Sequence, residues 1–499
     1  MKRKVLSMLM AGCLVVGSSS MTLAAEKKCY NPTPKCTNED CIVHAHSSVT
    51  KVLRCKKHHR HNARCYTIKV KKLTALEKAE KVLLARMNVN RALKDMSYLS
   101  EKIGPRVSTT NEEYQSAQYI QKQFRKMGYR ATIQPFDVMG SATSEVKNGD
   151  TVITSKAFKG STATTGINAE VVYCGLGAAA DFENVDVTGK IVLLKRGTVT
   201  FVEKVQNATN AGAAAVVMFN TGENAYAGSC NPNCVPAVGI GLSDGEALVA
   251  KLDAGEQVNL NVVVNEPEML TSWNVVATQK PYDRRDKNNT NEIVCITAHH
   301  DSVALAPGAN DNASGTVAML EIARAMKGLD IDKEIRFIAC GSEEVGLLGS
   351  KAYVASLTED EKSRVVGSFN MDMVATAYST AEKNCTELAV YTNSGEENAV
   401  TDAMSLAGKR LACLSTDEVE YNGDYDGPMG SSDHVPFEAA GMPASLFINV
   451  DPALKGNPRS AIEPYYHKPT DVMANVTKDR LERTIKLVGL AVYHTLNTK

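Results

Sequence analysis

The residues best suited to chemistry lie in short polar segments that follow apolar runs. The first segment, 297–302, reads TAHHDS and comes directly after the β-branched run 293–296. The others are, in chain order, Asp311 after a Pro-Gly turn, Glu343 and Glu344 after the apolar run 335–340, Asp372 after 367–371, and His467 before KPTD. Short apolar runs between polar residues are typical of buried parallel strands. Imidazole and carboxylate groups at strand ends suit a borderline metal such as zinc.

Several buried carboxylates in one place favour one or two divalent cations, because an unpaired buried charge is costly. Glu343 and Glu344 point in different directions if the chain is extended, so one can bind metal while the other acts on water. In paired metal sites the ions lie about 3.5–4 Å apart and lower the pKa of water. The alternatives are a polar surface loop at 297–315 and a solvated Glu343–Glu344 pair. The combination of segments favours the metal site.

This ordered set of motifs resembles the M28 family of co-catalytic zinc aminopeptidases. The motifs are AHHDS, PGANDNASG, GSEEVGLLGSKAY, NMDMV, SSDHVPFEAAGMP and YYHKPTD. The resemblance implies an α/β fold, a mixed and mostly parallel β-sheet flanked by helices, of the zinc-exopeptidase, phosphorylase/hydrolase-like type. It also implies two Zn²⁺ per chain and hydrolysis of N-terminal residues from peptides or proteins.

Carried over residue by residue, the resemblance gives each zinc ion its ligands. His299 and Asp372 match the ligands of one zinc ion. Glu344 and His467 match the ligands of the other. Asp311 matches the carboxylate that bridges the two ions.

The same resemblance implies three catalytic roles. Glu343 matches the general base, which takes a proton from the attacking water and later gives one to the leaving amine. Asp301 matches the partner that orients His299. Tyr466 matches the hydroxyl that stabilises the tetrahedral oxyanion in some members.

Two further histidines compete for the ligand positions. His300 follows His299, and on a strand its side chain would face the opposite way, so we expect it not to bind metal. His434, in SSDH, is the alternative to His467. The family pattern favours His467, with Asp433 and His434 near the site as support.

Residues 146–266 differ in composition, being richer in Gly, Ala and Val. Residues 189–194 and 213–219 read as buried strands, and 201–211 as a helix. The segment holds no histidine, so no zinc site is expected there. DFENVDVTGKIVLLKRG, FVEKVQNATNAGAAAVVMFN and PAVGIGLSDGEAL resemble the protease-associated (PA) domain, which implies a lid or substrate-positioning module. The PA-like insert would interrupt a catalytic domain whose two parts are 73–145 and 267–499.

The first part of the catalytic domain contains a clear amphipathic helix. Thr110 or Asn111 can cap it. Its apolar face is formed by residues at helical spacing, Ala117, Ile120, Phe124 and Met127.

Residues 1–25 resemble a secretory signal, with a charged start, an apolar run and a small-residue exit. The protein is therefore expected outside the cell. Lipid anchoring at Cys13 is the alternative. Residues 26–72 hold 12 Lys and Arg against 3 Asp and Glu, whereas 73–499 hold 41 against 53. We expect 26–72, a Cys/His-rich leader or propeptide, to dock electrostatically on the acidic body.

Length and charge bound the remaining possibilities. A chain of 499 residues is long enough for two or three domains. The zero net charge gives no reason to expect nucleic acid, and no stretch after the signal could span a bilayer. The sequence does not indicate the oligomeric state or the preferred N-terminal residue.

Thirteen cysteines, twelve of them after the signal, fit an oxidising compartment. Cys230 with Cys234, and Cys385 with Cys413, are plausible disulfide pairs. Cys295 and Cys340 lie in apolar runs and are expected to pack as small core residues.

The same scaffold could serve other functions. A dipeptidase or glutamate-type carboxypeptidase of the family would share the metal centre. A related cyclotransferase is disfavoured by the complete double-metal set and the PA-like module. A catalytically inactive, receptor-like binding protein would be expected to lose metal ligands, and all five positions are filled.

Overall fold

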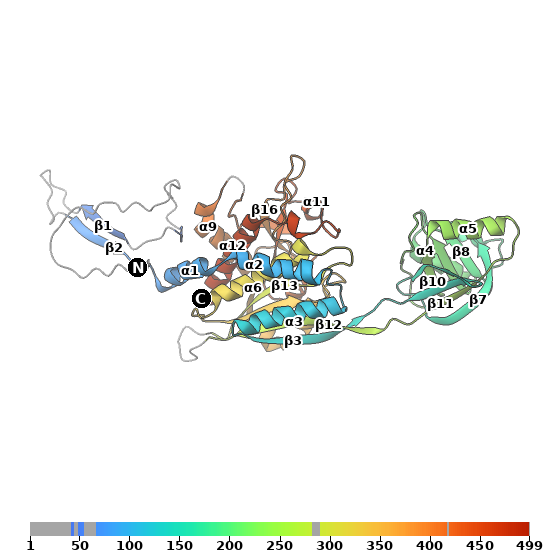
Figure 1. Ribbon diagram of the computed structural model, residues 1–499, viewed down its shortest axis with the longest axis horizontal. Helices are drawn as coiled ribbons and strands as arrows, with labels where there is room; N and C mark the ends of the chain where they lie inside the picture. Colours follow the sequence, from blue (N-terminus) through green and yellow to red (C-terminus); the bar gives the residue numbers. More distant parts are fainter. Residues whose placement is uncertain (1–40, 44–47, 54–65, 282–289, 417–418, 499) are drawn as a thin grey trace, which may run out of the picture. The chain divides into compact units, whose positions relative to one another are not determined.

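The computed structural model describes residues 41–43, 48–53, 66–281, 290–416 and 419–498. They form two eight-stranded sheets and a small two-stranded sheet, with helices packed on the larger sheets (Figure 1). The predicted signal at 1–25, with Cys13, lies outside the described residues. In the part of the chain that is described, no helix is both long enough and apolar enough to cross a membrane.

The larger domain is built on one mixed sheet. In sheet order its strands are β17 (Tyr425–Pro428), β16 (Glu387–Thr392), β18 (Ala444–Val450), β15 (Val365–Met371), β13 (Ile293–His299), β14 (Glu334–Cys340), β12 (Met269–Gln279) and β3 (Arg130–Met139). The four central strands, β18 to β14, run parallel. The pairs β16–β18, β12–β14 and β12–β3 are antiparallel. Because β16 and β17 also pair in parallel, the predicted mixed and mostly parallel sheet is confirmed.

Helices cover both faces of this sheet. One face packs against α3 (Asn111–Lys126), α6 (Gly315–Met326), α9 (Ala399–Leu411) and α12 (Lys478–Asn497), and α1 (Ala75–Arg86) and α2 (Val89–Ser97) pack in turn on α6 and α12. The other face packs against α7 (Leu348–Ala355) and α10 (His434–Ala439). In Figure 1, α3 lies along β3 and β12. Its predicted apolar face is confirmed, because Ala117, Ile120 and Phe124 are fully buried.

The central strand β13 shows why its sequence is apolar throughout. Val294 and Ile296 point into the core beneath α6, whereas Ile293 and Cys295 point into the core shared with α7 and α10. A strand covered on both faces has no polar side. Since side chains alternate along a strand, His299 at its end and His300 just after it leave the backbone on opposite sides.

The second domain has its own sheet. In sheet order its strands are β5 (Thr151–Ile153), β4 (Ser144–Asn148), β11 (Asn259–Val264), β7 (Thr164–Tyr173), β8 (Ile191–Lys195), β9 (Ala215–Phe219), β10 (Ala237–Ile240) and β6 (Ser155–Ala157). Two helices, α4 (Phe201–Asn210) and α5 (Leu242–Asp253), pack on it. The predicted buried strands correspond to β8 and β9. The chain changes sheet between 139 and 144 and again between 264 and 269. The predicted start of the insert, residue 146, lies inside β4.

The predicted disulfide between Cys385 and Cys413 is wrong. Cys413 pairs with Cys41 of the leader, 372 residues away, and the next leader residue, Ile42, is buried in the core of the larger domain. Cys385 is a buried free thiol beside a backbone carbonyl. The second predicted pair is also absent, because Cys230 and Cys234 are both free.

The described parts of the leader also include a β-hairpin-like pair, β1 (Ser48–Leu53) with β2 (Tyr66–Lys71). The remaining leader positions, with their Cys/His cluster, lie outside the described residues. Cys295 and Cys340 are fully buried among apolar neighbours, as expected from their strands.

Candidate metal centre

Three neighbouring parallel strands end at one edge of the larger sheet, and each delivers polar side chains. The register aligns His299, the last residue of β13, with Cys340, the last residue of β14. The other groups are Glu343 and Glu344 after β14, Asp372 after β15, Asp311 in the turn η4 (Ala309–Ser314) before α6, and His467 in the loop before α12. Strand ends that share an edge place their following residues together, which is where ligands gather in open α/β sheets.

One group of donor atoms surrounds the ring of His299. Its Nε2 lies 3.3 Å from Oδ1 of Asp311 and 3.3 Å from Oδ1 of Asp372. The Oε2 atom of Glu343 is 3.9 Å from the same nitrogen. His299, Asp311 and Asp372 are all buried, so these charges face one another with little water between them.

A second group surrounds the ring of His467. Its Nε2 lies 2.8 Å from Oε2 of Glu344 and 3.4 Å from Oδ2 of Asp311. The two oxygens of Asp311 therefore face two different histidines. A carboxylate in this position is shared between the two groups of donors.

Asp301 lies beside both His299 and the turn after β14. One oxygen lies 3.4 Å from Nδ1 of His299, on the side of the ring opposite Nε2. The same carboxylate accepts the backbone N–H groups of Glu343 at 3.1 Å and Glu344 at 3.2 Å. Asp301 is completely buried.

Three supporting residues were not predicted as part of the site. Asp471 accepts the backbone N–H groups of Asn310 at 2.7 Å and Asp311 at 3.0 Å. Ser432 donates from Oγ to Oδ2 of Asp372 at 2.8 Å. Arg106, fully buried, donates from Nε to the carbonyl of His300 at 2.7 Å. Asp471 and Ser432 lie inside the YYHKPTD and SSDHVPFEAAGMP motifs, which was the available signal.

The spacing of the donors fits a tetrahedral cation. Zinc bonds to nitrogen and oxygen of about 2.0–2.1 Å give a donor-to-donor edge of about 3.3 Å. Two of the edges around His299 have this length, and so does the edge from Asp311 to His467, at 3.4 Å. Buried atoms without a hydrogen-bond partner point to the same conclusion, since they include Glu344 Oε1, Asp372 Oδ1 and His467 Nε2.

Comparisons with known proteins agree with this geometry. Residues 274–492 match Peptidase family M28, and residues 167–248 match the PA domain. The Bacillus subtilis protein named Aminopeptidase YwaD is 38% identical over 413 residues, which cover 81% of this chain and 84% of the relative. This chain belongs to peptidase family M28.

Solved structures of related proteins span almost the same region. BSAP, described as a zinc aminopeptidase from Bacillus subtilis, is 37% identical with a TM-score of 0.66, covering 83% of this chain and 96% of its own. An aminopeptidase from Aneurinibacillus sp. strain AM-1 is 39% identical with a TM-score of 0.61, covering 84% and 97%. The predicted resemblance to family M28 with an inserted PA domain is confirmed.

The electrostatics of the M28 site are dominated by negative charge. Burial alone lowers the pKa of His299, but Asp372 and Glu343 raise it well above its ordinary value. Burial and then Glu344 raise the pKa of Asp311 to about 8. Acids and an imidazole that all bind protons more tightly than usual share a strongly negative local field. A divalent cation is the natural complement of such a field.

The two histidines that competed for the ligand positions, His300 and His434, are turned to backbone carbonyls. His300 donates from Nε2 to the carbonyl of Trp273 at 2.8 Å, and His434 from Nε2 to that of Met429 at 2.6 Å. Neither ring joins the two donor groups around His299 and His467.

Tyr466 lies beside His467 and is partly exposed. Its ring stacks on that of His467 with centroids 3.7 Å apart, and 38% of the residue is exposed. Partial burial and then Asp311 and Glu344 raise the pKa of its hydroxyl. The hydroxyl therefore keeps its proton at neutral pH and can act as a hydrogen-bond donor.

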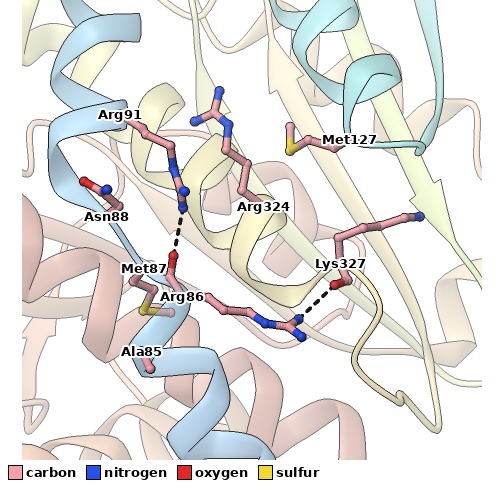
Figure 2. Close-up of a pocket in the computed structure, with 8 residues that line it drawn as sticks. All are labelled: Ala85, Arg86, Met87, Asn88, Arg91, Met127, Arg324 and Lys327. Carbon is pink, nitrogen blue, oxygen red and sulfur yellow. Dashed lines mark hydrogen bonds between the residues drawn. The ribbon is translucent and has the colours of Figure 1, made fainter. Parts of the chain in front are cut away.

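The pocket drawn in Figure 2 is separate from the M28 site and shares none of its residues. It lies between α1, α2 and α6, and four cations line it. Arg91 is held by Glu321 and by the carbonyl of Arg86, and Arg324 by Asp95. The remaining two, Arg86 and Lys327, reach backbone carbonyls. These cations join the helices to one another.

Proposed function

We propose that this M28 peptidase is a zinc-dependent aminopeptidase that binds two zinc ions per chain and removes N-terminal residues from peptides or proteins. The observation that carries the proposal is the position of Asp311. Its two oxygens lie 3.3 Å from His299 and 3.4 Å from His467. The 37% identical structure described as a zinc aminopeptidase supports the choice of metal and reaction.

Five side chains would hold the two ions. His299 and Asp372 would bind one ion, Glu344 and His467 the other, and Asp311 both. This mixture of imidazole and carboxylate suits zinc, a cation of borderline softness. When bound, the zinc ions acidify a water at neutral pH and polarise the scissile carbonyl.

Glu343 is the proposed general base. Its Oε2 atom lies 3.9 Å from Nε2 of His299, farther away than the nearest oxygens of Asp311 and Asp372, which are both at 3.3 Å. Burial and then the carboxylate of Asp372 raise the pKa of Glu343, although His299 opposes the shift. A carboxylate with raised proton affinity can take a proton from the attacking water at Oε2 and pass it to the leaving amine.

Two other residues complete the proposed mechanism. Asp301 keeps Nδ1 of His299 protonated, so that Nε2 faces the metal position. The Tyr466 hydroxyl would donate a hydrogen bond to the oxyanion that develops on the scissile carbonyl.

We also propose that the enzyme acts outside the cell. The signal-like segment 1–25 and the disulfide between Cys41 and Cys413 both fit an oxidising compartment. The leader 26–72 would be exported together with the catalytic domain. The PA domain would help to position peptide substrates beside the catalytic domain formed by 73–145 and 267–499.

The test is Glu343→Gln, assayed with aminoacyl chromogenic substrates and by zinc content. Gln has the shape of Glu but cannot accept a proton, so turnover should fall about 10²–10⁴-fold while both zinc ions are retained. Glu359→Gln, an exposed position on the helix 359–364, is the matched control and should change neither quantity. Wild-type turnover in Glu343→Gln, or activity that survives removal of metal by chelator, would overturn the proposal.

A second substitution tests the ligand assignment. His467→Ala should lose zinc, because Nε2 of His467 faces Glu344 and Asp311. His434→Ala should retain it, because Nε2 of His434 is directed to a carbonyl. The opposite pattern would move the ligand role to His434.

A further inference from the structure

Glu113 is a carboxylate in the first turn of α3 and is not one of the candidate metal ligands. Its side chain is completely buried. Its Oε1 accepts the hydroxyl of Ser272 at 2.7 Å and the backbone N–H of Ser342 at 2.9 Å. Its Oε2 accepts the backbone N–H of Thr109 at 2.7 Å. All of these partners are donors, which suits an ionised carboxylate, although burial and then the charge of Asp301 raise the pKa of Glu113 to about 8.

The two backbone groups that Glu113 accepts belong to residues in an unfavourable conformation. Thr109 has φ of 66° and Ser342 has φ of 52°. This left-handed region is disfavoured for residues other than glycine, and it persists only where surrounding contacts enforce it. Glu113 supplies the acceptor that holds both residues there.

Ser342 comes immediately before Glu343, so its conformation sets the direction in which the base leaves the backbone. The next two amides, of Glu343 and Glu344, donate to Asp301 at 3.1 and 3.2 Å. Two buried carboxylates thus accept three consecutive backbone N–H groups. Glu113 accepts that of Ser342, and Asp301 accepts those of Glu343 and Glu344. The fit is tight on the Glu113 side, where a Cβ on Gly341 would lie 2.7 Å from Oε1.

We propose that Glu113 is a positioning residue that aims the side chain of Glu343 by holding Ser342 in its left-handed conformation. The inference rests on the proposed function, because it takes Glu343 as the base. It adds a residue from the helix α3, 230 positions before Glu343 in the chain, which acts through the backbone N–H of Ser342 at 2.9 Å and the Ser342 hydroxyl at 3.4 Å.

The principal test is Glu113→Gln. A Gln side chain has one oxygen and one NH₂ group, so one of the two backbone N–H groups must face another donor. The turn then loses one of the hydrogen bonds that hold it, and a displaced base slows the chemical step more than it weakens substrate binding. We expect kcat to fall about 10²-fold, with KM and zinc content unchanged, because only a transition-state interaction is lost.

A matched pair of second substitutions separates positioning from a general folding defect. Ser342→Gly and Ser342→Ala both remove the hydroxyl, but only glycine adopts φ of 52° without strain. Combined with Glu113→Gln, Ser342→Gly should recover most of the lost kcat, whereas Ser342→Ala should recover none. Equal behaviour of the two double variants would overturn the proposal.

The control is Glu112→Gln, which removes the same charge from the same helix turn without touching Ser342. It should have wild-type kcat. Circular dichroism and thermal unfolding should show that every variant is folded. If Glu343→Gln is inactive but Glu113→Gln keeps wild-type kcat, the inference fails and the proposed function stands. If Glu343→Gln is fully active, the proposed function itself fails.

Discussion

Replacing Asp301 with Asn tests how the site is held before any chemistry occurs. Three donors converge on this buried carboxylate: Nδ1 of His299 at 3.4 Å and the backbone amides of Glu343 and Glu344 at 3.1 and 3.2 Å. Asn keeps the shape but replaces one acceptor oxygen by an NH₂ group. If that group faces Glu344, the N–H of Glu344 loses its acceptor. If it faces His299, the imidazole must change tautomer and the N–H of Glu343 is left unpaired.

The size of the effect follows from the number of donors affected. One buried, unsatisfied donor costs about 1–3 kcal/mol. If that cost falls on the metal-loaded state, zinc affinity drops roughly 5- to 150-fold, since about 1.4 kcal/mol is a factor of ten. This range overlaps the roughly 10–100-fold loss typical when the partner of a metal-binding histidine is removed.

The assay is competition for zinc between the protein and a chromophoric chelator, with turnover measured at saturating zinc. Asp301→Asn should bind zinc roughly 10- to 100-fold more weakly than the wild type, which is the range where the two figures overlap. Asp402→Asn, an exposed change on α9, is the control and should match the wild type. Wild-type zinc affinity in Asp301→Asn would refute the reasoning, because it would mean that the three donors do not depend on the charged acceptor.

Two further predictions concern stability. Burial raises the pKa of Glu463 to about 7, although hydrogen bonds from Thr376 and Asn310 oppose the shift. The folded state therefore binds the proton more tightly than the unfolded state, and stability falls as pH rises from 4.5 to about 7, by about 3 kcal/mol. In chelator-treated protein, Glu463→Gln should raise the melting temperature at pH 8 and not at pH 4.5, and a pH-independent difference would contradict this. Cys413→Ser should lower stability by about 2–4 kcal/mol. Reductant should lower the melting temperature of the wild type to that of Cys413→Ser and leave the variant unchanged; if both respond equally, the disulfide with Cys41 is not the cause.

The sequence was most informative where a polar residue directly follows a buried strand. The apolar runs before His299, Glu343 and Asp372 predicted parallel strands, and parallel strands bring their carboxyl ends to one edge. The chemistry of the side chains then indicated a metal. Asp311 and His467 required the family resemblance, because each lies in a loop whose path the hydrophobic pattern does not specify.

The disulfide prediction failed for a different reason. The prediction paired Cys385 with Cys413, which lies 28 residues further along the chain. Cys413 instead pairs with Cys41, across 372 residues, where Ile42 packs into the core of the larger domain. Pairing of cysteines depends on tertiary proximity, and a leader segment gives no local signal of where it docks.

The supporting residues of the site could not be predicted because they act on the backbone. Arg106 donates to the carbonyls of His300 and Pro307, both at 2.7 Å, and Asp471 accepts the N–H of Asp311 at 3.0 Å. Glu113 accepts the N–H of Ser342 in the same manner. A backbone group is identical in every non-proline residue, so its partner leaves no complementary residue type in the sequence. In the sequence, Arg106 and Glu113 read as ordinary charged residues beside a helix start. Both side chains are completely buried, and each one fixes a different segment of the chain that carries candidate ligands or the candidate base. The geometry of the site therefore depends on charged side chains that do not contact those ligands or that base.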